Sequence, residues 1–546
     1  MYEGDVNDIM VLNLLNDTGV IAPWEDVATR ELDINLPMTG VVAQQTKQIK
    51  LTTTSISNSP VAAPFGPGEF YAHDIAESIR HDFGRLPVYV IDDVHAEELD
   101  DGVSIERIPS EPGFTWLHVH VADPTAILPP THALSQQAYR QLETYYFVDR
   151  TIPMLPRGEI FERMSLGYAS QSGQPENVMS FSMKVNEEGE IVDYKVRAGL
   201  VRNVKQLRYD DVDAAMGLPP VAISYPFGNP NASGQLQTPK YDSTTMEDLS
   251  LLRKVTRKLV DERVQNGAFT FTIGSVTMSI DPKPTFELLG TSRPSRFSGF
   301  PQMTYMVQEM AVQESGSRQI VAECMKSASR VASRFFRDRG IPAIRRSVAQ
   351  MQTEVQGGME LLMASRDENG YAPYHTAVKL GIISPGSRYD LIPAAHSLLG
   401  VPDGEGYTRV TSPLRRFCDM IAHWQIKHAL LSPSQPSSPL FSEDWLRRFA
   451  DNLGMHESKT RRMQMVQNNF WAMRFLQRWI AEWEMGAHRD EPNPLDSLIA
   501  QSSGNVMLDW RTSTHQLQVF LPQLGLKATL NDINTDDQWD IGRLSR

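Results

Sequence analysis

The sequence has little cysteine, no long apolar run and no excess of positive charge, and each shortage excludes a class of protein. Two cysteines, Cys324 and Cys418, are too few for a disulfide framework or a cysteine-based zinc site. No apolar run approaches the roughly 20 residues needed to cross a bilayer, so we expect no membrane span. The formal net charge of -14 excludes a surface that is basic throughout, but it allows a basic channel.

The first thirty residues also lack the composition of an organelle transit peptide. They carry several acids and a single basic residue, Arg30, whereas transit peptides are rich in arginine and poor in acids. The whole chain is 41% hydrophobic and 22% charged, which is typical of a globular protein. Because 546 residues exceed one ordinary core, we expect two or three structural units.

Periodicity along the chain predicts an α+β fold in four parts. A helical lead-in and a linker rich in Ser, Thr, Pro and Gly occupy residues 1–70, and a large mixed domain follows at 71–432. A helical segment is expected at 433–487, and short strands typical of a small β-barrel at 488–546. We expect strands at 88–92, 114–123, 177–201 (a hairpin turning near Gly189) and 268–280 (a strand pair), and helices at 246–265, 303–339, 417–431 and 443–486 (capped by Ser442).

Acidic side chains crowd the stretch VIDDVHAEELDDGVSI, residues 90–105, where six of sixteen positions are Asp or Glu. Asp92 closes an apolar strand, Glu98 follows in the loop, and Asp100 and Asp101 are adjacent. Repulsion and burial raise the pKa of such a pair unless a cation neutralises it, and magnesium is held by carboxylates in this way. The alternative is a solvated acidic loop, which the apolar flanks disfavour. The residues alone leave both interpretations open.

Five segments, in order over about 330 residues, resemble the RNase II-like family of RNB-domain 3′-to-5′ exoribonucleases. Glu98 stands where the family more commonly has aspartate, and in this the chain resembles the fungal mitochondrial branch. The five segments are VIDDVHAEELDDGVSI (90–105), LHVHVADP (117–124), YYFVDRTIPMLP (145–156), GIPAIRR (340–346) and YTRVTSPLRRFCDMIAH (407–423).

The resemblance implies an α+β catalytic domain that uses Mg²⁺ to hydrolyse single-stranded RNA processively to nucleoside 5′-monophosphates. It implies that Asp92, Glu98, Asp100 and Asp101 hold the metal, with Asp100 indispensable to catalysis. Two magnesium ions about 4 Å apart stabilise both the attacking and the leaving oxygen of such a displacement.

The resemblance also assigns residues that contact RNA. Arg415 is expected to contact the scissile phosphate and take part in catalysis, because a guanidinium binds phosphate through two parallel hydrogen bonds. Arg416 is expected to neutralise the RNA backbone, and Tyr146 to stack on the last base. The sequence SPLRR independently predicts a helix start, with Ser412 as its cap.

Location and partners follow from the resemblance alone. It implies RNA turnover and processing in mitochondria, with the cytoplasm as the alternative because this chain carries no transit peptide. An RNA helicase in a degradosome-like complex is the expected partner, and an S1-like OB barrel is expected at 488–546. Two other functions stay open: an RNA-binding protein of the same fold without catalysis, and a structural subunit of a mitochondrial RNA-handling complex. The presence of all four acids favours the enzyme.

Overall fold

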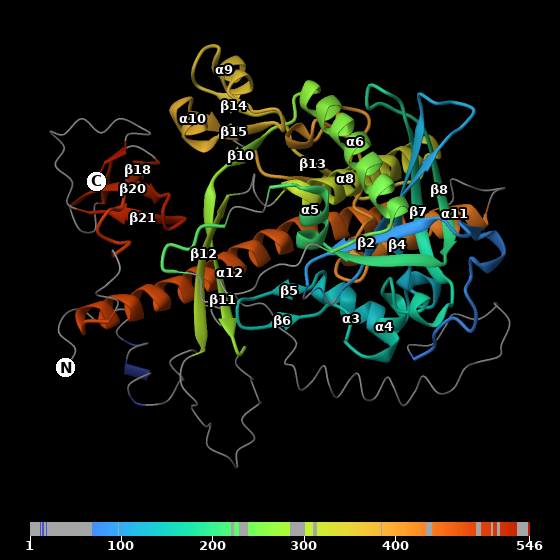
Figure 1. The fold of residues 1–546 in the computed structure, drawn as a ribbon, viewed down its shortest axis with the longest axis horizontal. Helices are drawn as coiled ribbons and strands as arrows, with labels where there is room; N and C mark the ends of the chain where they lie inside the picture. The colour runs from blue at the N-terminus through green and yellow to red at the C-terminus, as the bar shows by residue number, and fades with distance from the viewer. Residues whose placement is uncertain are drawn as a thin grey trace.

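The computed structural model contains a large α+β body, which confirms the predicted fold class, and a small group of strands near the carboxyl end (Figure 1). Most of the predicted helical lead-in and linker at 1–70 lies outside the described residues. The structure describes residues 11, 14–15, 18, 68–94, 96, 98–219, 223–228, 239–283, 301–309, 314–383, 385–432, 439–487, 493–503, 506–509, 514–531 and 544–545.

A seven-stranded sheet forms the centre of the large body, in the order β1-β8-β7-β4-β3-β2-β9. The inner strands are antiparallel, whereas β1 and β9 pair in parallel with β8 and β2 at the two edges. The bounds of its strands are β1 His81–Asp82, β2 Pro87–Asp92, β3 Asp101–Arg107, β4 Thr115–Ala122, β7 Glu176–Val185, β8 Ile191–Val201 and β9 Asn203–Arg208.

Alternation along the strands builds one hydrophobic core on each face of the sheet. On β2, Tyr89 belongs to a core with helices α6 and α8, and its neighbour Val90 belongs to a second core with α3, α11 and α12. The helices are α3 Ala133–Gln141, α4 Glu159–Met164, α5 Tyr209–Met216, α6 Ser243–Gln265, α8 Gly316–Asp338, α9 Gly358–Ala364, α10 Tyr374–Lys379, α11 Phe417–Leu431 and α12 Glu443–Glu484.

Short strands outside the central sheet pair mainly in twos. They are β5 Tyr145–Tyr146, β6 Thr151–Ile152, β10 Thr270–Thr272, β11 Gly274–Asp281, β12 Gln302–Glu309, β13 Arg345–Ser347, β14 Gln352–Thr353, β15 Tyr371–Pro373, β16 Ile382–Ile383 and β17 Arg388–Asp390. The last five strands form one further sheet: β18 Ala500–Ser502, β19 Met507–Asp509, β20 Thr514–Leu521, β21 Leu526–Leu530 and β22 Leu544–Ser545.

Several elements agree with the sequence predictions. The hairpin of β7 and β8 turns at Gly189, whose φ of 91° is a left-handed conformation that glycine adopts without strain. Helices α6, α11 and α12 lie within a few residues of their predicted bounds. The backbone N–H of Trp445 donates to the side chain of Ser442 at 3.3 Å, which confirms the predicted cap of α12.

The predicted helix at 303–339 is wrong in its first part. Residues 302–309 form β12, which pairs with β11 over its whole length, and α8 begins only at Gly316. Tyr305 and Val307 are buried in a core with residues of β11 and α12, and the residues on either side of them are less buried. Every second residue is thus buried, which is the period of a strand. Two strands, β10 and β11, lie within or near the predicted 268–280, but they do not pair with each other, because β10 pairs with β15 and β11 with β12.

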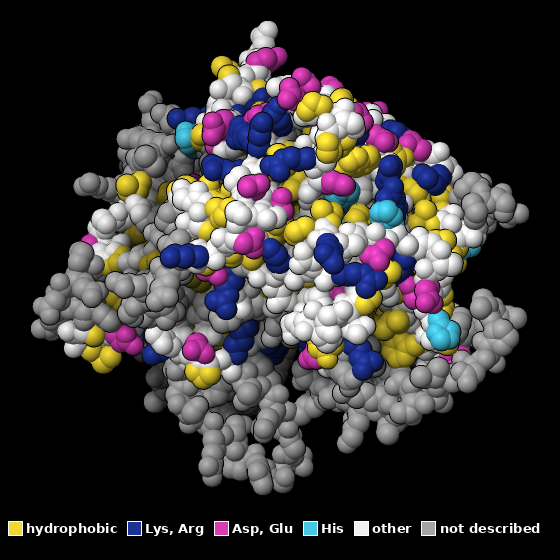
Figure 2. All heavy atoms as spheres, turned by 45° about the vertical axis from the view of Figure 1, so that its right-hand side comes forward, with side chains coloured by type: hydrophobic (Ala, Val, Ile, Leu, Met, Phe, Trp, Pro, Cys, Tyr) yellow, Lys and Arg dark blue, Asp and Glu magenta, His cyan; other side chains and the backbone are white. Residues whose placement is uncertain are grey.

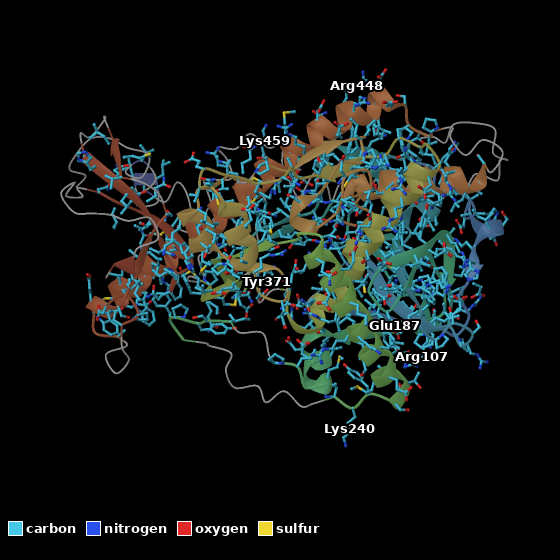
Figure 3. All side chains as sticks on the ribbon, turned by 90° about the horizontal axis from the view of Figure 1, so that it is seen from above. Arg107, Glu187, Lys240, Tyr371, Arg448 and Lys459 are labelled. Atoms are coloured by element: carbon cyan, nitrogen blue, oxygen red, sulfur yellow. The ribbon has the colours of Figure 1, made fainter. Side chains whose placement is uncertain are left out.

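The helix α12 runs the length of the large body toward the carboxy-terminal strands (Figure 1). Viewed from above, it carries Arg448 and Lys459, while Lys240 lies at the opposite margin (Figure 3). In Figure 2, basic and acidic side chains are mixed over the visible face. None of the described helices is long and apolar enough to span a membrane. The four-part division of the chain and the S1-like barrel stay predictions.

Candidate active site

Two strand ends place carboxylates at one edge of the central sheet. β2 ends at Asp92, and its antiparallel neighbour β3 begins at Asp101. The loop between them is fixed at its end, since the carbonyl of Asp100 accepts a hydrogen bond from the backbone N–H of Ala122 at 2.6 Å. The sheet therefore delivers Asp92, Asp100 and Asp101 to the same place, as the sequence predicts.

Asp100 is the most enclosed of these acids, with 3% of its surface exposed. Its Oδ1 accepts a hydrogen bond from the backbone N–H of Leu414 at 2.8 Å. Its Oδ2 is buried without a hydrogen-bond partner, and the nearest cation is Nε of Arg415, at 3.7 Å. Burial raises the pKa of Asp100 well above its ordinary value, although Arg415 opposes the shift.

The two flanking acids are shifted in the same direction. Burial, with repulsion from Asp92, raises the pKa of Asp101 to about 7. Burial also raises the pKa of Asp92, whose Oδ1 accepts a hydrogen bond from the backbone N–H of Asp93 at 2.8 Å. Burial thus disfavours the charged form of all three carboxylates, and a nearby cation would stabilise that form.

The donor set fits a hard divalent cation. Among the residues that the structure describes, no three His, Cys, Asp or Glu side chains form a ready-made metal site. Magnesium does not need one, because it takes one or two carboxylates and keeps several waters. The partnerless Oδ2 of Asp100, beside Asp92 and Asp101 at the sheet edge, is where such an ion would find ligands.

Glu98 points to a different set of partners. Its Oε2 accepts a hydrogen bond from the hydroxyl of Tyr146, and its Oε1 accepts from Oγ1 of Thr144 at 3.1 Å and from Nη2 of Arg157 at 3.4 Å. The membership of Glu98 in the metal set therefore stays a prediction, and its present contacts are with other groups.

The aromatic residue and the arginine predicted to contact RNA lie next to the acids. Tyr146 on β5 is 44% exposed, and the side chain of Arg415 is 43% exposed. The backbone N–H of Thr144 donates to the carbonyl of Arg415 at 2.9 Å, which joins the start of β5 to the turn before α11. An accessible ring, an accessible guanidinium and buried carboxylates thus meet at one site.

Arg416 is placed differently from Arg415. Its Nη2 is 2.8 Å from Oδ2 of Asp419, a fully buried carboxylate. Oδ2 of Asp419 also accepts a hydrogen bond from the backbone N–H of Ser412 at 2.8 Å. Ser412 therefore does not cap the helix as predicted, and α11 begins at Phe417 because Asp419 holds the preceding turn. A contact of Arg416 with RNA stays a prediction.

Two further residues near the acids were missed by the sequence analysis. Nη2 of Arg318, in the first turn of α8, lies 2.7 Å from Oδ1 of Asp93. The same guanidinium stacks over the ring of Tyr209, 4.5 Å from its centre. Burial, with the nearby charges of Asp101 and Asp92, raises the pKa of Tyr209. No local motif marks Arg318, because 225 residues separate it from Asp93.

Other polar residues of the motifs are structural. Nδ1 of His118 pairs with Oγ of Ser182 at 2.8 Å, and His120 bridges Ser104 and Ser180 in the same way.

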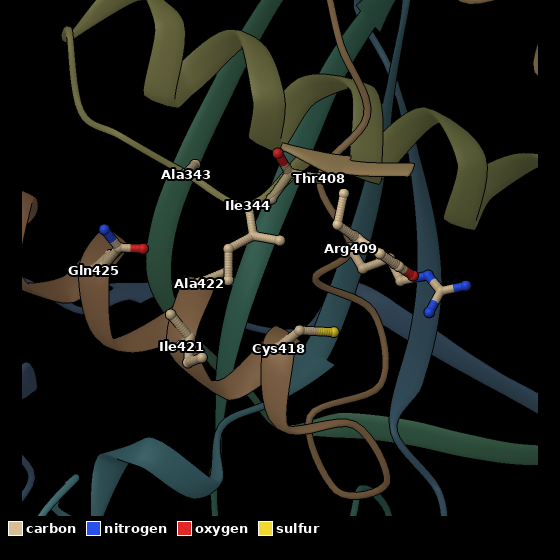
Figure 4. A pocket seen from close by; sticks show the side chains of 9 residues that line it. Ala343, Ile344, Thr408, Arg409, Cys418, Ile421, Ala422 and Gln425 are labelled. Carbon is tan, nitrogen blue, oxygen red and sulfur yellow. The ribbon is translucent and has the colours of Figure 1, made fainter. Parts of the chain in front are cut away.

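Figure 4 shows the small cavity beside Cys418 and Arg409, whose volume of about 10 Å³ is too small for a nucleotide. Cys418 is buried there with a free thiol.

The comparisons with known proteins agree with this geometry. Residues 80–432 match the family model described as "RNB domain". A curated relative, "Exoribonuclease II, mitochondrial" of Schizosaccharomyces pombe, is 27% identical over 414 residues, which cover 74% of this chain and 41% of the relative. The chain thus spans less than half the length of that relative.

Solved structures share the fold. The Dss1 exoribonuclease of Candida glabrata, solved as an active-site mutant, superposes with a TM-score of 0.72 at 20% identity, covering 100% of this chain and 62% of its own. RNase R of Mycoplasma genitalium, solved with ribose-methylated single-stranded RNA, superposes with a TM-score of 0.64 at 14% identity, covering 95% and 74%. On the match that covers residues 80–432, the chain belongs to the RNB domain family.

Proposed function

We propose that this protein is a magnesium-dependent, processive 3′-to-5′ exoribonuclease that hydrolyses single-stranded RNA to nucleoside 5′-monophosphates. The observation that carries the proposal is the partnerless, buried Oδ2 of Asp100, which lies 3.7 Å from Nε of Arg415 in a group of acids that also includes Asp101 and Asp92. A buried carboxylate oxygen usually has a hydrogen-bond partner, so an oxygen without one that lies among further acids is a candidate ligand of a cation. Membership in the RNB domain family supports the same activity.

Each residue has a part that follows from its position. Asp100 is fixed by the backbone N–H of Leu414, so its free oxygen is aimed without loss of side-chain entropy. Arg415 is exposed enough to reach a phosphate and close enough to Asp100 to stabilise charge that builds beside it. Asp92 and Asp101 complete the set of hard oxygen ligands. Bound magnesium would stabilise the negative charge that develops on the scissile phosphate.

RNA would be held mainly by contacts that do not depend on its sequence. The exposed ring of Tyr146 offers a face on which any base can stack, and such stacking is worth about 1–3 kcal/mol per base. Arg415, and by the family resemblance Arg416, would bind the phosphates on either side of the reacting bond. The hydroxyl of Tyr146 is anchored, so the ring is oriented before RNA arrives.

We further propose that the protein acts in mitochondrial RNA turnover and processing, and that an RNA helicase is its partner. The name of the Schizosaccharomyces pombe relative supports the location. The proposal of a helicase partner rests only on the resemblance to the fungal branch. It is tested by purifying the protein from mitochondria and looking for an RNA helicase that co-purifies with it.

The direct test is degradation of an unstructured RNA labelled at its 5′ end. With magnesium, the protein should shorten the labelled RNA from its 3′ end to a short end product and release nucleoside 5′-monophosphates. EDTA should stop the reaction. If the RNA is bound but not shortened, the protein is instead an RNA-binding member of the family. If the RNA is neither bound nor shortened, the result favours the alternative that the protein is a structural subunit of an RNA-handling complex.

A further inference from the structure

We propose that Glu98 is a positioning residue that holds Tyr146 in place for RNA, rather than a ligand of the metal. The inference rests on the proposed function, in which the ring of Tyr146 stacks on the terminal base. It assigns the one acid that departs from the common family pattern to a role in substrate binding.

The contacts of Glu98 differ in kind from those of Asp100. Only 5% of the Glu98 side chain is exposed, and both of its oxygens are engaged: Oε2 by the hydroxyl of Tyr146, Oε1 by Thr144 at 3.1 Å and Arg157 at 3.4 Å. A metal ion bound by Glu98 would compete with these donors, which already occupy three of the roughly four lone-pair sites of the carboxylate. Asp100, by contrast, already offers an oxygen without a hydrogen-bond partner.

These contacts orient the Tyr146 ring, on which the terminal base of the RNA would stack. Thr144 and Tyr146 are two residues apart on one extended segment, so their side chains face the same side and Glu98 binds both. The anchored hydroxyl fixes the Tyr146 ring, while 44% of the residue remains exposed to receive a base. Thr144 also donates its backbone N–H to the carbonyl of Arg415 at 2.9 Å, so the same segment is tied to the arginine. Fixing a binding group beforehand lowers the entropy cost of binding.

The length of the side chain gives the inference a sharp test. Aspartate is shorter than glutamate by one carbon–carbon bond, about 1.5 Å, so it would not reach the Tyr146 hydroxyl from position 98. Glutamine keeps the length and can still hydrogen-bond Tyr146 and Thr144, but it gives up the ion pair with Arg157 and is a weaker magnesium ligand than a carboxylate because it is neutral. If Glu98 positions Tyr146, Glu98→Gln should bind RNA more tightly than Glu98→Asp. If Glu98 is a metal ligand, Glu98→Asp should instead keep more of the magnesium-dependent activity than Glu98→Gln.

The first experiment measures RNA affinity in EDTA, where neither metal nor chemistry contributes. The RNA carries 2-aminopurine at its 3′-terminal position, so stacking on Tyr146 quenches its fluorescence. We expect Glu98→Gln to bind within about 2-fold of the wild type, and Glu98→Asp and Glu98→Ala to bind about 5- to 10-fold more weakly with less quenching. Equal affinity of the wild type, Glu98→Asp and Glu98→Ala would overturn the proposal, and so would a wild type that shows no quenching.

A double-mutant cycle tests the link itself. Tyr146→Phe keeps the ring and removes the hydroxyl. As a single substitution it should weaken RNA binding, and added to Glu98→Ala it should cause no further loss. Independent, additive losses would show that the two residues do not act together. Glu162→Gln, an exposed acid on α4, is the matched control and should leave affinity unchanged. Equal melting temperatures for each variant and the wild type establish that the fold is intact.

A magnesium titration separates this inference from the proposed function. The magnesium concentration for half-maximal RNA shortening should be the same in Glu98→Gln and the wild type. A several-fold increase in Glu98→Gln would make Glu98 a metal ligand and overturn the inference. If the wild type shortens no RNA but the affinities in EDTA follow the expected order, only the exoribonuclease activity is refuted.

Discussion

The two oxygens of Asp100 have different surroundings, and this separates a structural contribution from a chemical one. Oδ1 holds the backbone of Leu414, whereas Oδ2 has no hydrogen-bond partner. Asparagine preserves the shape and the acceptor for Leu414 but removes the charge. The substitution Asp100→Asn therefore isolates the chemical part.

We expect Asp100→Asn to reduce the rate of RNA shortening by at least about 100-fold, the order of loss seen when a group that stabilises a transition state is removed. RNA affinity should stay within about 2-fold of the wild type, because Tyr146 and Arg415 are untouched. Single-turnover gels and fluorescence anisotropy measure the two quantities. An Asn variant that degrades RNA at the normal rate would remove Asp100 from the catalytic set.

Tyr146→Ala should change where degradation stops. Removing the ring costs roughly 1–3 kcal/mol of binding to the terminal base, so a short RNA should dissociate before it is cut again. The expected result is a longer end product on a sequencing gel, with initial shortening of long RNA little affected. An end product of unchanged length would contradict the stacking role.

A buried ion cluster joins the end of β4 to helix α11, at the scale of whole elements. Oδ1 of Asp123 lies 2.7 Å from Nζ of Lys427, and Oδ2 lies 2.7 Å from Nη2 of Arg80. Burial opposes the ionisation of Asp123, but Lys427 and Arg80 outweigh it and lower the pKa of Asp123 below its ordinary value. The carboxylate is therefore charged in the folded protein and stabilises two cations that solvent does not reach.

We expect Asp123→Asn to lower the free energy of unfolding by about 3–5 kcal/mol, because it leaves Lys427 buried without a counter-charge and leaves Arg80 with Asp74 as its remaining acidic partner. Thermal unfolding followed by tryptophan fluorescence measures the loss. Asp82→Asn is the matched control, because Asp82 pairs with Arg202 on the surface and its removal should leave the melting temperature nearly unchanged. Equal melting temperatures for the two variants would refute the importance of the buried cluster.

His132 makes the start of α3 sensitive to pH. Its Nδ1 accepts a hydrogen bond from the backbone N–H of Leu134 at 3.0 Å, and its ring stacks on Phe70. Burial lowers the pKa of His132 to about 4, so the ring stays neutral in the folded protein while the unfolded chain takes up a proton below its ordinary value of about 6.5. Stability from this group is full above pH 6.5 and falls as the pH drops toward 4.

His132→Asn should therefore make stability less dependent on pH. Asparagine also caps a helix and does not titrate, so between about pH 7 and pH 5 the variant should lose about 2 kcal/mol less than the wild type does. Melting temperatures at the two pH values provide the comparison. His375→Asn, at an exposed position, should keep the wild-type dependence. The same dependence in His132→Asn and the wild type would contradict the assignment.

How far the sequence predicts the structure depends on how local each feature is. Alternation and capping predict the hairpin at Gly189 and the start of α12, because these depend on neighbouring residues. The strand β12 was missed because its apolar residues also suit a helix, and only pairing with β11 decides between them. At the site, the placement of Asp92, Asp100 and Asp101 follows from the strand ends, but Arg318 approaches from a distant helix.

The charge of the whole molecule bears on RNA binding, because an acidic protein must hold RNA through local basic groups. The net charge is -14, and Figure 2 shows basic and acidic side chains mixed over one face. Lys459 and Arg462 are exposed on α12. The same helix contacts β5 where Nε2 of His456 lies 2.9 Å from the hydroxyl of Tyr145, next to Tyr146. We therefore expect these two cations to bind phosphates of an RNA that leads to the site.

RNA affinity should therefore fall as salt rises, with a slope of about -0.7 in log–log form for each phosphate contacted. Lys459→Gln combined with Arg462→Gln should weaken binding at low salt and make the slope shallower by about 1.4 if each residue contacts one phosphate. Lys240→Gln is the control, because Lys240 lies at the opposite margin of the molecule (Figure 3). Anisotropy titrations in EDTA at several salt concentrations give the slopes. If the Lys459 and Arg462 double variant keeps the wild-type slope, the path of the RNA does not run along α12.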